Sequence, residues 1–480
     1  MTDIIAGTVL STVLNSSGSY TLLAGTHTVT ASLTMAAGIS LTGTPGAVLV
    51  IGQSPGTGVL LRPDSNTVFH GLERIAFAPD NHFRVAAAQA SNVSWRQCVF
   101  EGAGREQAHI EVFAATGNVL HSHISVIDCD FQEAGIVCNV ATNLMVKGNR
   151  FNNPAGTRGV RMWGSGHRVL NNEFRGGSVF AVSYLSNIDV VKGIAIATDG
   201  VISGNTIYDC IEESISLDLV GNSYASCSVR DYDVVPSTGH GDAGKRVVSL
   251  DSANWAGSSA YNNGNWHMAF VSGALAGNVY RIVAHANAAF LLDITDTDYD
   301  LIATSDGVAI QAAVYGIKIA NNYIHTEAGG SSNKGSGVVL HGCGHGCTVA
   351  NNVVSVLGST GDPGVWALRE ADLVNIAGAG VTGLSLRAPV GNNIIINNNW
   401  ERGAVGRWYR NYTTGNDYAP LAFAESNGLS GIGASRLENG AWVAGVRGSD
   451  DLPLPLRPDM GAVQDRSYPG RRFSVGGASL

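Results

Sequence analysis

The sequence predicts an all-β protein built as a solenoid of stacked coils, with one inserted β module and an extended C-terminal tail. Period-2 alternation of apolar residues runs through most of the chain, and no sustained 3.6-residue apolar stripe indicates a long helix. One short pattern also recurs at intervals of roughly one solenoid coil. The length of 480 residues exceeds one ordinary compact domain, which favours an elongated array.

Composition and charge exclude several classes of protein. Charged residues make up 14 % of the chain and Gly occurs 61 times; the low charge argues against intrinsic disorder. No stretch is long and apolar enough to span a bilayer, so we expect no membrane insertion. A net charge of −9 argues against nucleic acid as the main partner.

The N-terminus and the cysteines bear on the compartment. The first residues, MTDIIAGTVLSTVLNSSG, lack the basic region and unbroken apolar core of a signal peptide. We therefore expect assembly in the cytoplasm or export by a route that the sequence does not show. Seven cysteines follow no small-domain framework, and their odd number leaves at least one unpaired within the chain. They are predicted to be reduced or buried thiols.

The recurring pattern consists of alternating apolar residues, then Asn, any residue, and an apolar or aromatic residue. Clear copies are LMVKGNRF (144–151), VISGNTI (201–207) and IKIANNYI (317–324), and two earlier copies carry Cys at the Asn position. An inward Asn in every coil can hydrogen-bond to its neighbours above and below, and a small Cys fits the same place. We predict one buried file made of this column: Cys98, Cys129, Asn149, Asn172, Asn205, Asn322, Asn352 and Asn398.

The N-terminal run YTLLAGTHTVTASLTMAAGISLTGTPGAVLVIG (20–52) carries a more specific pattern of spaced Leu, Val and Gly. Followed by the Asn coils, it resembles the right-handed parallel β-helix of the pectin-lyase-like superfamily, in its tailspike-like form. The resemblance covers about 20–224 and 314–400. It implies three parallel sheets and a substrate groove along one of them. It implies no single reaction, because the superfamily includes lyases, hydrolases, epimerases and non-catalytic fibres.

The spacing of the Asn column also predicts the domains. The 117-residue step from Asn205 to Asn322 marks an insertion, so the β-helix is expected over 1–224 and 314–400, with a sandwich-like β module over 225–313. Residues 401–480 form an aromatic- and Gly-rich region and an extended tail, whose DLPLPLRPD run (451–459) cannot be a central strand. We expect the module to project beside Asp218 and overhang the acids around it.

Those acids are the candidate catalytic residues. A second segment follows each Asn strand, with inward residues at its second and fourth positions, so Asp218 in SISLD (214–218) points outward. Glu212 and Glu213 precede it. Crowded carboxylates raise one another's pKa and can divide acid and base roles, which predicts catalysis by Glu212, Glu213 and Asp218. The same three could instead hold a Ca²⁺ ion; no other cofactor is expected.

Equivalent outward positions in other coils combine aromatic, cationic and acidic residues, the mixture that sugars require. The HGCGHGC turn (341–347) invites a zinc site or a Cys343–Cys347 disulfide, but a tight turn before an inward Cys347 is favoured, so no metal site is predicted there. The predicted substrate-binding residues are Arg161, Trp163, His341, Trp366, Arg369, Glu370 and Arg387.

Together these features predict a phage or prophage tailspike-like protein that binds and depolymerises a bacterial surface polysaccharide, by hydrolysis or elimination. Such spikes resemble one another in being homotrimers, and the setting would be a virion tail or the extracellular space. A secreted bacterial polysaccharide lyase or hydrolase is the alternative enzyme. A non-catalytic adhesin or structural fibre is the alternative of another class. The basic catalytic strand of a typical pectate lyase is missing, so pectin is not favoured.

Overall fold

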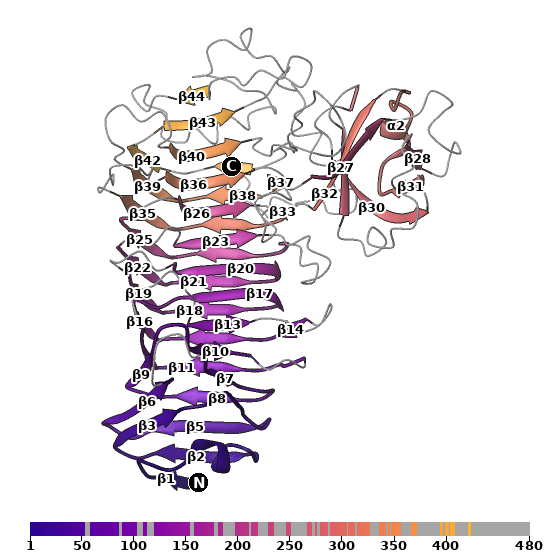
Figure 1. Ribbon diagram of the computed structural model, residues 1–480. Coiled ribbons are helices and arrows are strands. Elements are labelled where there is room, and N and C mark those ends of the chain that lie inside the picture. Colours follow the sequence, from indigo (N-terminus) through magenta and orange to yellow (C-terminus); the bar gives the residue numbers. More distant parts are fainter. Residues whose placement is uncertain are drawn as a thin grey trace.

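A computed structural model of the chain shows a tall stack of coils with one antiparallel sheet at its side (Figure 1). The structure describes most residues up to 356 and a few short strands beyond. The described ranges are 1–52, 58–85, 89–102, 109–112, 120–153, 158–176, 181–185, 197–210, 213–218, 229–234, 246–250, 266–270, 274–275, 279–286, 289–304, 306–312, 314–326, 336–341, 344–345, 347–356, 366–371, 394–396, 399–402, 404–408 and 421–423.

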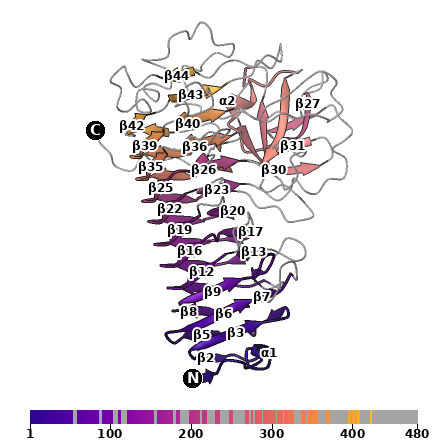
Figure 2. The ribbon, with the colours of Figure 1, turned by 60° about the vertical axis from the view of Figure 1, so that its left-hand side comes forward.

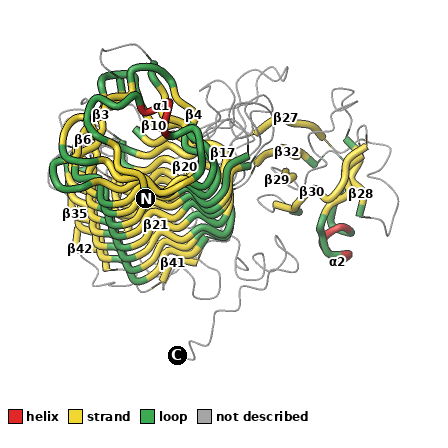
Figure 3. Tube along the Cα trace, turned by 90° about the horizontal axis from the view of Figure 1, so that it is seen from below, coloured by secondary structure: helices red, strands yellow, loops and turns green. Residues whose placement is uncertain are grey.

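Three long sheets form the stack, and the chain visits them in the order A, B, C before rising to the next coil. All pairings within sheets A and B are parallel, as are those of sheet C apart from its last strand. Viewed from the N-terminal end, the chain runs clockwise as it recedes, which makes the solenoid right-handed (Figure 3). The predicted right-handed parallel β-helix is therefore confirmed.

The strands of each sheet follow one another along the solenoid axis. Sheet A contains β1 (Thr2–Ile4), β2 (Gly18–Leu22), β5 (Ile39–Gly43), β8 (Val68–His70), β11 (Ser94–Arg96), β15 (Ser125–Ile127), β18 (Met145–Lys147), β21 (Arg168–Leu170), β24 (Val201–Ser203), β34 (Lys318–Ala320), β38 (Thr348–Ala350) and β41 (Ile394–Ile396). Sheet B contains β3 (Gly25–Val29), β6 (Ala47–Ile51), β9 (Arg74–Phe77), β12 (Val99–Glu101), β16 (Asp130–Gln132), β19 (Arg150–Asn152), β22 (Glu173–Arg175), β25 (Thr206–Tyr208), β35 (Tyr323–Thr326), β39 (Val353–Val356) and β42 (Asn399–Arg402).

Sheet C carries the outward segments that the sequence analysis singled out. It contains β4 (Leu33–Thr34), β7 (Leu60–Arg62), β10 (His82–Arg84), β13 (Ile110–Val112), β17 (Ile136–Thr142), β20 (Val160–Ser165), β23 (Val182–Leu185), β26 (Glu213–Asp218), β36 (Ser336–His341), β40 (Trp366–Ala371), β43 (Ala404–Trp408) and the antiparallel β44 (Leu421–Phe423), while the short β14 (His121–Ser122) pairs with β17. Because β42 and β43 still belong to sheets B and C, the β-helix continues past residue 400, where the tail region was expected to begin.

The predicted Asn file exists and lies at the corner between sheets A and B. Each side-chain Oδ1 accepts two hydrogen bonds from the Asn of the preceding coil: the backbone N–H and the Nδ2 of Asn149 both donate to Asn172, at 2.9 Å each. The same pair of bonds joins Asn172 to Asn205, and Asn205 to Asn322 across the insertion. The Cys129 backbone N–H donates to Asn149, so the cysteines do occupy the start of the file. Asn398 lies outside the described residues.

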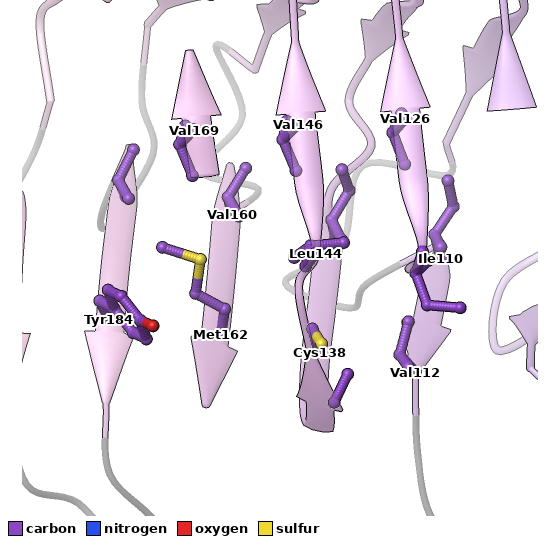
Figure 4. Packing of buried hydrophobic residues seen from close by; sticks show 14 of the residues in the cluster. Ile110, Val112, Val126, Cys138, Leu144, Val146, Val160, Met162, Val169 and Tyr184 are labelled. Atoms are coloured by element: carbon purple, nitrogen blue, oxygen red, sulfur yellow. The ribbon is translucent and has the colours of Figure 1, made fainter. Parts of the chain in front are cut away.

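Behind this file, apolar residues of the three sheets meet in a continuous core. On sheet B, Phe100, Phe131, Phe151 and Phe174 stack one above another with ring centroids 4.5 to 4.7 Å apart. Figure 4 shows the inward side chains of sheet C, such as Met162 and Tyr184, facing those of sheet A. Cys98, Cys129, Cys138, Cys210 and Cys347 are buried and free, as predicted for the thiols.

Between β26 and β34 the chain leaves the solenoid and forms a separate antiparallel sheet. Its six strands are ordered β27 (Val229–Val234), β32 (Gly307–Ala312), β29 (Trp266–Phe270), β30 (Val279–Ala286), β31 (Ala289–Leu292) and β28 (Val247–Ser249). Figures 1 and 2 place this sheet beside the upper coils. The remaining elements are α1 (Leu10–Val13), α2 (Asp296–Tyr299) and the parallel pair β33 (Val314–Tyr315) and β37 (Gly344–His345).

Candidate functional site

Sheet C holds every predicted site residue that the structure describes. Arg161 and Trp163 lie on β20, Glu213 and Asp218 on β26, and His341 on β36; Trp366, Arg369 and Glu370 lie on β40. Glu212 and Arg387 lie outside the described residues. The sequence pattern therefore assigned the predicted residues to a common sheet, although it misjudged how closely some of them lie.

The acids on β26 do not crowd together as expected. Glu213 is the first residue of that strand and Asp218 is the last. Asp218 lies five positions after Glu213 on an extended strand, so their Cα atoms are about 16 Å apart. The proposed mutual rise in pKa requires carboxylates within a few ångströms, so it cannot operate between these two. The catalytic role predicted for them loses that support and stays a prediction.

Asp218 has a different neighbour, which the pairing of the strands identifies. Leu217 pairs with Leu340, so the next residues along, Asp218 and His341, stand at equivalent places on adjacent strands. Neighbouring strands lie about 4.8 Å apart. The backbone thus brings a carboxylate-bearing and an imidazole-bearing position together at the corner from which the inserted sheet departs.

The assignment of positions on β40 was wrong by three residues. The repeat GVWAL (364–368) suggested that Trp366 and Leu368 occupy outward columns. In the structure Leu368 pairs with the buried Val338, and Arg369 pairs with Val339. An odd shift exchanges the two faces of a strand, so Leu368 lies in the inward column and Arg369 in the outward one. Arg369 takes the column place that was expected for Trp366.

Trp163 points away from the core, as predicted, but it does not offer an open face. It is only 2 % exposed and packs with Leu185 and the half-buried Val137 in a small cluster outside sheet C. The guanidinium of Arg161 lies over its ring, 4.8 Å from the centroid. Ser183 and Ser216, in the same outward column as Arg161, are also buried. The outer face is therefore covered over β20, β23 and β26.

A group of charged residues lower on the same face was missed by the sequence analysis. Glu111 on β13 accepts a hydrogen bond from the Nε2 of His82 at 2.9 Å, and one from the Nη2 of Arg84 at 2.7 Å. The Arg84 Nε donates to the same oxygen at 2.9 Å. We call these three residues the His–Arg–Glu cluster. The Arg84 side chain is 37 % exposed, so the guanidinium remains within reach of a ligand.

The electrostatics of this cluster fix the charge of its carboxylate. Burial alone raises the pKa of Glu111, but the hydrogen bond from His82 and the charges of His82 and Arg84 outweigh it, so the pKa lies below its usual value. Glu111 is therefore ionised at neutral pH. Nearby His109 packs on the Phe77 ring, with centroids 4.8 Å apart, and burial lowers its pKa to about 4. His109 is thus a neutral residue behind the cluster.

A sequence signal for the cluster existed, though it was weak. HFR (82–84) places His82 and Arg84 two apart, on one face of a strand, and HIEV (109–112) places Glu111 on a strand of the next coil. Arg84 and Glu111 are 27 residues apart, close to one coil. Their strands are only three residues long, and the pattern occurs once, so no repeated column drew attention to it.

Among the residues that the structure describes, no three His, Cys, Asp or Glu side chains gather as a metal site would require. The expected Ca²⁺ site involves Glu212, which lies outside them. Within the described part, no helix has the length and apolar character needed to cross a membrane.

No family model matches the chain, and no curated protein does. Solved structures are similar to it. The A-module of mannuronan C-5 epimerase AlgE4 from Azotobacter vinelandii is 12 % identical, with 80 % of each chain covered and a TM-score of 0.35. A double mutant of the tailspike protein of E. coli bacteriophage HK620 is 12 % identical over 82 % of this chain and 57 % of its own, with a TM-score of 0.34. PfbA, a surface adhesin of Streptococcus pneumoniae, is 8 % identical over 81 % and 80 %, with a TM-score of 0.30.

These three are an epimerase, a tailspike and an adhesin, so likeness to them does not select one activity. This chain spans just over half the length of the tailspike that it matches. Any functional conclusion has to come from the side chains of the chain itself.

Proposed function

We propose that the protein binds and depolymerises an acidic polysaccharide on the outer face of sheet C. The observation that carries this proposal is the His–Arg–Glu cluster, which joins an imidazole, a guanidinium and an ionised carboxylate on a rigid strand face. The Arg84 side chain is 37 % exposed, and a guanidinium within reach of solvent can pair with a sugar carboxylate in a two-pronged geometry.

One column of outward residues on sheet C runs along the solenoid axis, which suits the binding of a polymer. Arg84, Glu111, Val137 and Arg161 fall in one outward column, on the consecutive strands β10, β13, β17 and β20. Three steps of about 4.8 Å place Arg84 and Arg161 about 14 Å apart along the solenoid axis. A chain laid parallel to the axis would meet the exposed positive charge of Arg84 at the lower end of this stretch, below the coils whose outer face is covered. Asp218 and His341 lie further along the same sheet.

Of the two reactions considered, elimination fits the cluster better than hydrolysis. Hydrolysis by paired carboxyl groups needs one of them protonated, with a raised pKa. Glu111 has a lowered pKa and is bound to two basic side chains. Elimination next to a sugar carboxylate needs a base for the α-proton and cations for the resulting anion. In this proposal His82 is the base that removes the α-proton, and Glu111 orients the His82 ring. Arg84 neutralises the sugar carboxylate.

The test is a panel of acidic bacterial and algal polysaccharides, followed by reducing ends and by the absorbance of unsaturated uronate. We expect both to rise with at least one polymer. Reducing ends without absorbance would mean hydrolysis and would overturn the proposed chemistry. Neither product, with binding retained, would mean a non-catalytic adhesin or fibre.

A matched pair of variants assigns the reaction to the cluster. Glu111→Gln should lower the rate by about 100-fold or more, the range for loss of an acid–base group or its partner. Glu101→Gln is the control, because Arg74 and Glu101 form a similar ion pair, 27 residues apart, on the outer face of sheet B. Equal rates for both variants would remove the cluster from the mechanism.

The biological setting is a finer part of the same proposal. A tailspike-like homotrimer should sediment at three times the chain mass and should act on a surface polysaccharide of a bacterium. A monomer that degrades only polymers from other sources would favour the secreted enzyme instead.

A further inference from the structure

The outer face of sheet B carries a group of aromatic residues in the upper coils. Tyr208 lies on β25, while Tyr323 and His325 lie on β35. Tyr323 is 38 % exposed. Among the Phe, Tyr and Trp side chains that the structure describes, it is the one that is exposed. These rings face away from the stacked phenylalanines and add nothing to the core, so a role at the surface has to be considered.

The strand register brings these residues together on the outer face of sheet B, where the Tyr208 and Tyr323 rings are inclined at 62° to each other. Arg175, Tyr208 and His325 occupy one column, in consecutive coils, and Glu173 and Tyr323 lie in the column beside it. The Tyr208 and Tyr323 ring centroids are 6.2 Å apart, and Tyr323 stacks on His325 at 6.3 Å with an interplanar angle of 13°. We call these five residues the tyrosine platform.

Charged groups adjoin the rings at the lower edge. The Arg175 guanidinium lies over the Tyr208 ring, 5.1 Å from its centroid, and its Nε donates to the Glu173 carboxylate. The Arg175 side chain is about half exposed and Glu173 about one third. The edge thus presents hydrogen-bond donors and acceptors to solvent beside the aromatic faces.

Lower coils of the same face have a different character. Asp130 pairs with Arg150, which pairs with Glu173, so charges of opposite sign alternate along the sheet. In the next column, Gln132 accepts a hydrogen bond from the Asn152 amide at 2.8 Å. Cross-strand pairs of this kind stabilise a sheet by roughly 0.2–1 kcal/mol each, and they explain the lower face. Such pairs do not explain why two tyrosines and a histidine lie on the upper coils of this face.

We propose that the tyrosine platform binds a pyranose residue of a neutral glycan. Aromatic faces accept the C–H side of a sugar ring, while Glu173 and Arg175 can hydrogen-bond to its hydroxyl groups. Their opposite charges cancel, which is the reason for choosing a neutral sugar over a uronate. A second copy of the chain is the alternative occupant, since tyrosine and arginine are also enriched in protein interfaces, and the experiment below separates the two. This surface lies on a different sheet from the His–Arg–Glu cluster and does not depend on it.

The experiment measures migration of the full chain in native gels containing dextran, galactomannan or xylan, with alginate as the acidic comparison. We expect a neutral polymer to retard the protein. Tyr323→Ala should weaken the retardation at least fivefold, and Tyr323→Phe should preserve it, because the ring and not the hydroxyl makes the contact. Leu120→Ala is the control, since Leu120 is equally exposed, at 37 %, and lies in a distant coil. Circular dichroism checks that each variant folds.

The other outcomes overturn the proposal. No retardation by any neutral polymer, or equal retardation of wild type and Tyr323→Ala, would remove the glycan site. A change of oligomeric state in Tyr323→Ala, without a change in retardation, would assign the platform to contact between copies. Glu111→Gln should bind the neutral polymer as wild type does, which separates this test from that of the depolymerase.

Discussion

The corner between sheets A and B keeps one length in coil after coil, whereas the corner between sheet C and the next sheet A does not. From β11 onward, two residues separate each described A strand from its B strand, as Gly148 and Asn149 do between β18 and β19. At the other corner, two residues separate β17 from β18, but β26 ends at Asp218 and β34 begins at Lys318. The inserted sheet occupies that interval.

Hydrogen bonding explains the constancy of the first corner. Its first residue has a left-handed backbone, with φ near 54° at Asn171 and 70° at Gly204, so Asn, Asp and Gly predominate there. Its second residue is the buried Asn, whose amide also donates to a backbone carbonyl of the preceding coil, as Asn172 does to Val146. An added residue would break these bonds in two coils at once, so length is fixed.

Among the residues that the structure describes, the second corner shows no such file. In one coil a histidine does comparable work: the Leu144 backbone N–H donates to the Nδ1 of His167 at 3.0 Å, and His167 Nε2 donates to the Trp163 carbonyl at 2.7 Å. In other coils the connection is long. A rigid corner thus holds the coils in register, while a permissive corner can carry loops and modules, which is where specificity usually resides.

The largest expected effect comes from breaking the rigid corner. Asn172→Leu removes the acceptor of two hydrogen bonds and the donor of two more, all buried. Each unsatisfied partner costs about 1–3 kcal/mol, so we expect the free energy of unfolding to fall by about 4 kcal/mol, measured by urea denaturation. Asn152→Ala, on the partly exposed side of sheet B, is the control and should cost less than about 1 kcal/mol. Similar losses in both would mean that the file is not special.

The permissive corner should be sensitive to pH where the Asn corner is not. Burial lowers the pKa of His167 to about 4, against an ordinary value of 6.5; the bond to the Trp163 carbonyl opposes this only in part. Between pH 6.5 and pH 4, His167 is therefore mostly protonated in the unfolded chain and mostly neutral in the folded chain. The stability contributed by neutral His167 is complete above pH 6.5 and is lost as pH falls toward 4, by about 3 kcal/mol.

The variant His167→Gln isolates this effect, because it can keep hydrogen bonds without titrating. The difference in unfolding free energy between wild type and variant, measured from pH 7 to pH 4, should change by about 3 kcal/mol. A constant difference would show that folding does not shift the pKa of His167.

The same contrast decides what the sequence could predict. The Asn file is visible in the sequence as a repeated pattern, because coil after coil needs the same buried amide. The fold and the inward column could therefore be predicted. Register on sheet C could not be predicted: every residue of GVWAL (364–368) is apolar or Gly, so the pattern did not reveal the three-residue shift that places Leu368 in the inward column. The role of the residue before each Asn also went unnoticed, although Asn171 and Gly204 there share one backbone conformation.

The side chains that we propose to be functional were harder to predict because they lie outside the repeat. His82 and Glu111 face outward on three-residue strands, and their pairing depends on two coils meeting in register. Tyr323 occupies the place in the Asn pattern that accepts any residue. Folding does not restrict which residue occupies a solvent-facing position. The apolar periodicity that predicts the core therefore gives no information about these positions.

A smaller effect is expected where β26 meets the permissive corner. Asp218 ends that strand beside the position of His341, whereas Glu213 begins it about 16 Å away. On a polymer that the protein cleaves, Asp218→Asn should lower the rate about tenfold, the loss of one charge-assisted contact of about 1.4 kcal/mol. Glu213→Gln should leave the rate unchanged. A loss of 100-fold or more in Asp218→Asn would make this residue catalytic and displace the His–Arg–Glu cluster from that role.

The smallest effect separates the two asparagines of a single rigid corner. Asn171 is exposed and has a φ of 54°, while its neighbour Asn172 is buried in the file. Asn171→Gly should change the free energy of unfolding by less than about 0.5 kcal/mol, because Gly adopts this conformation without strain. Asn171→Ala should cost about 1 kcal/mol, since a Cβ without a compensating polar group disfavours it. Urea denaturation of both variants gives the comparison. If Ala and Gly were equivalent there, the left-handed turn would not restrict the sequence, and the Asn file alone would fix the corner.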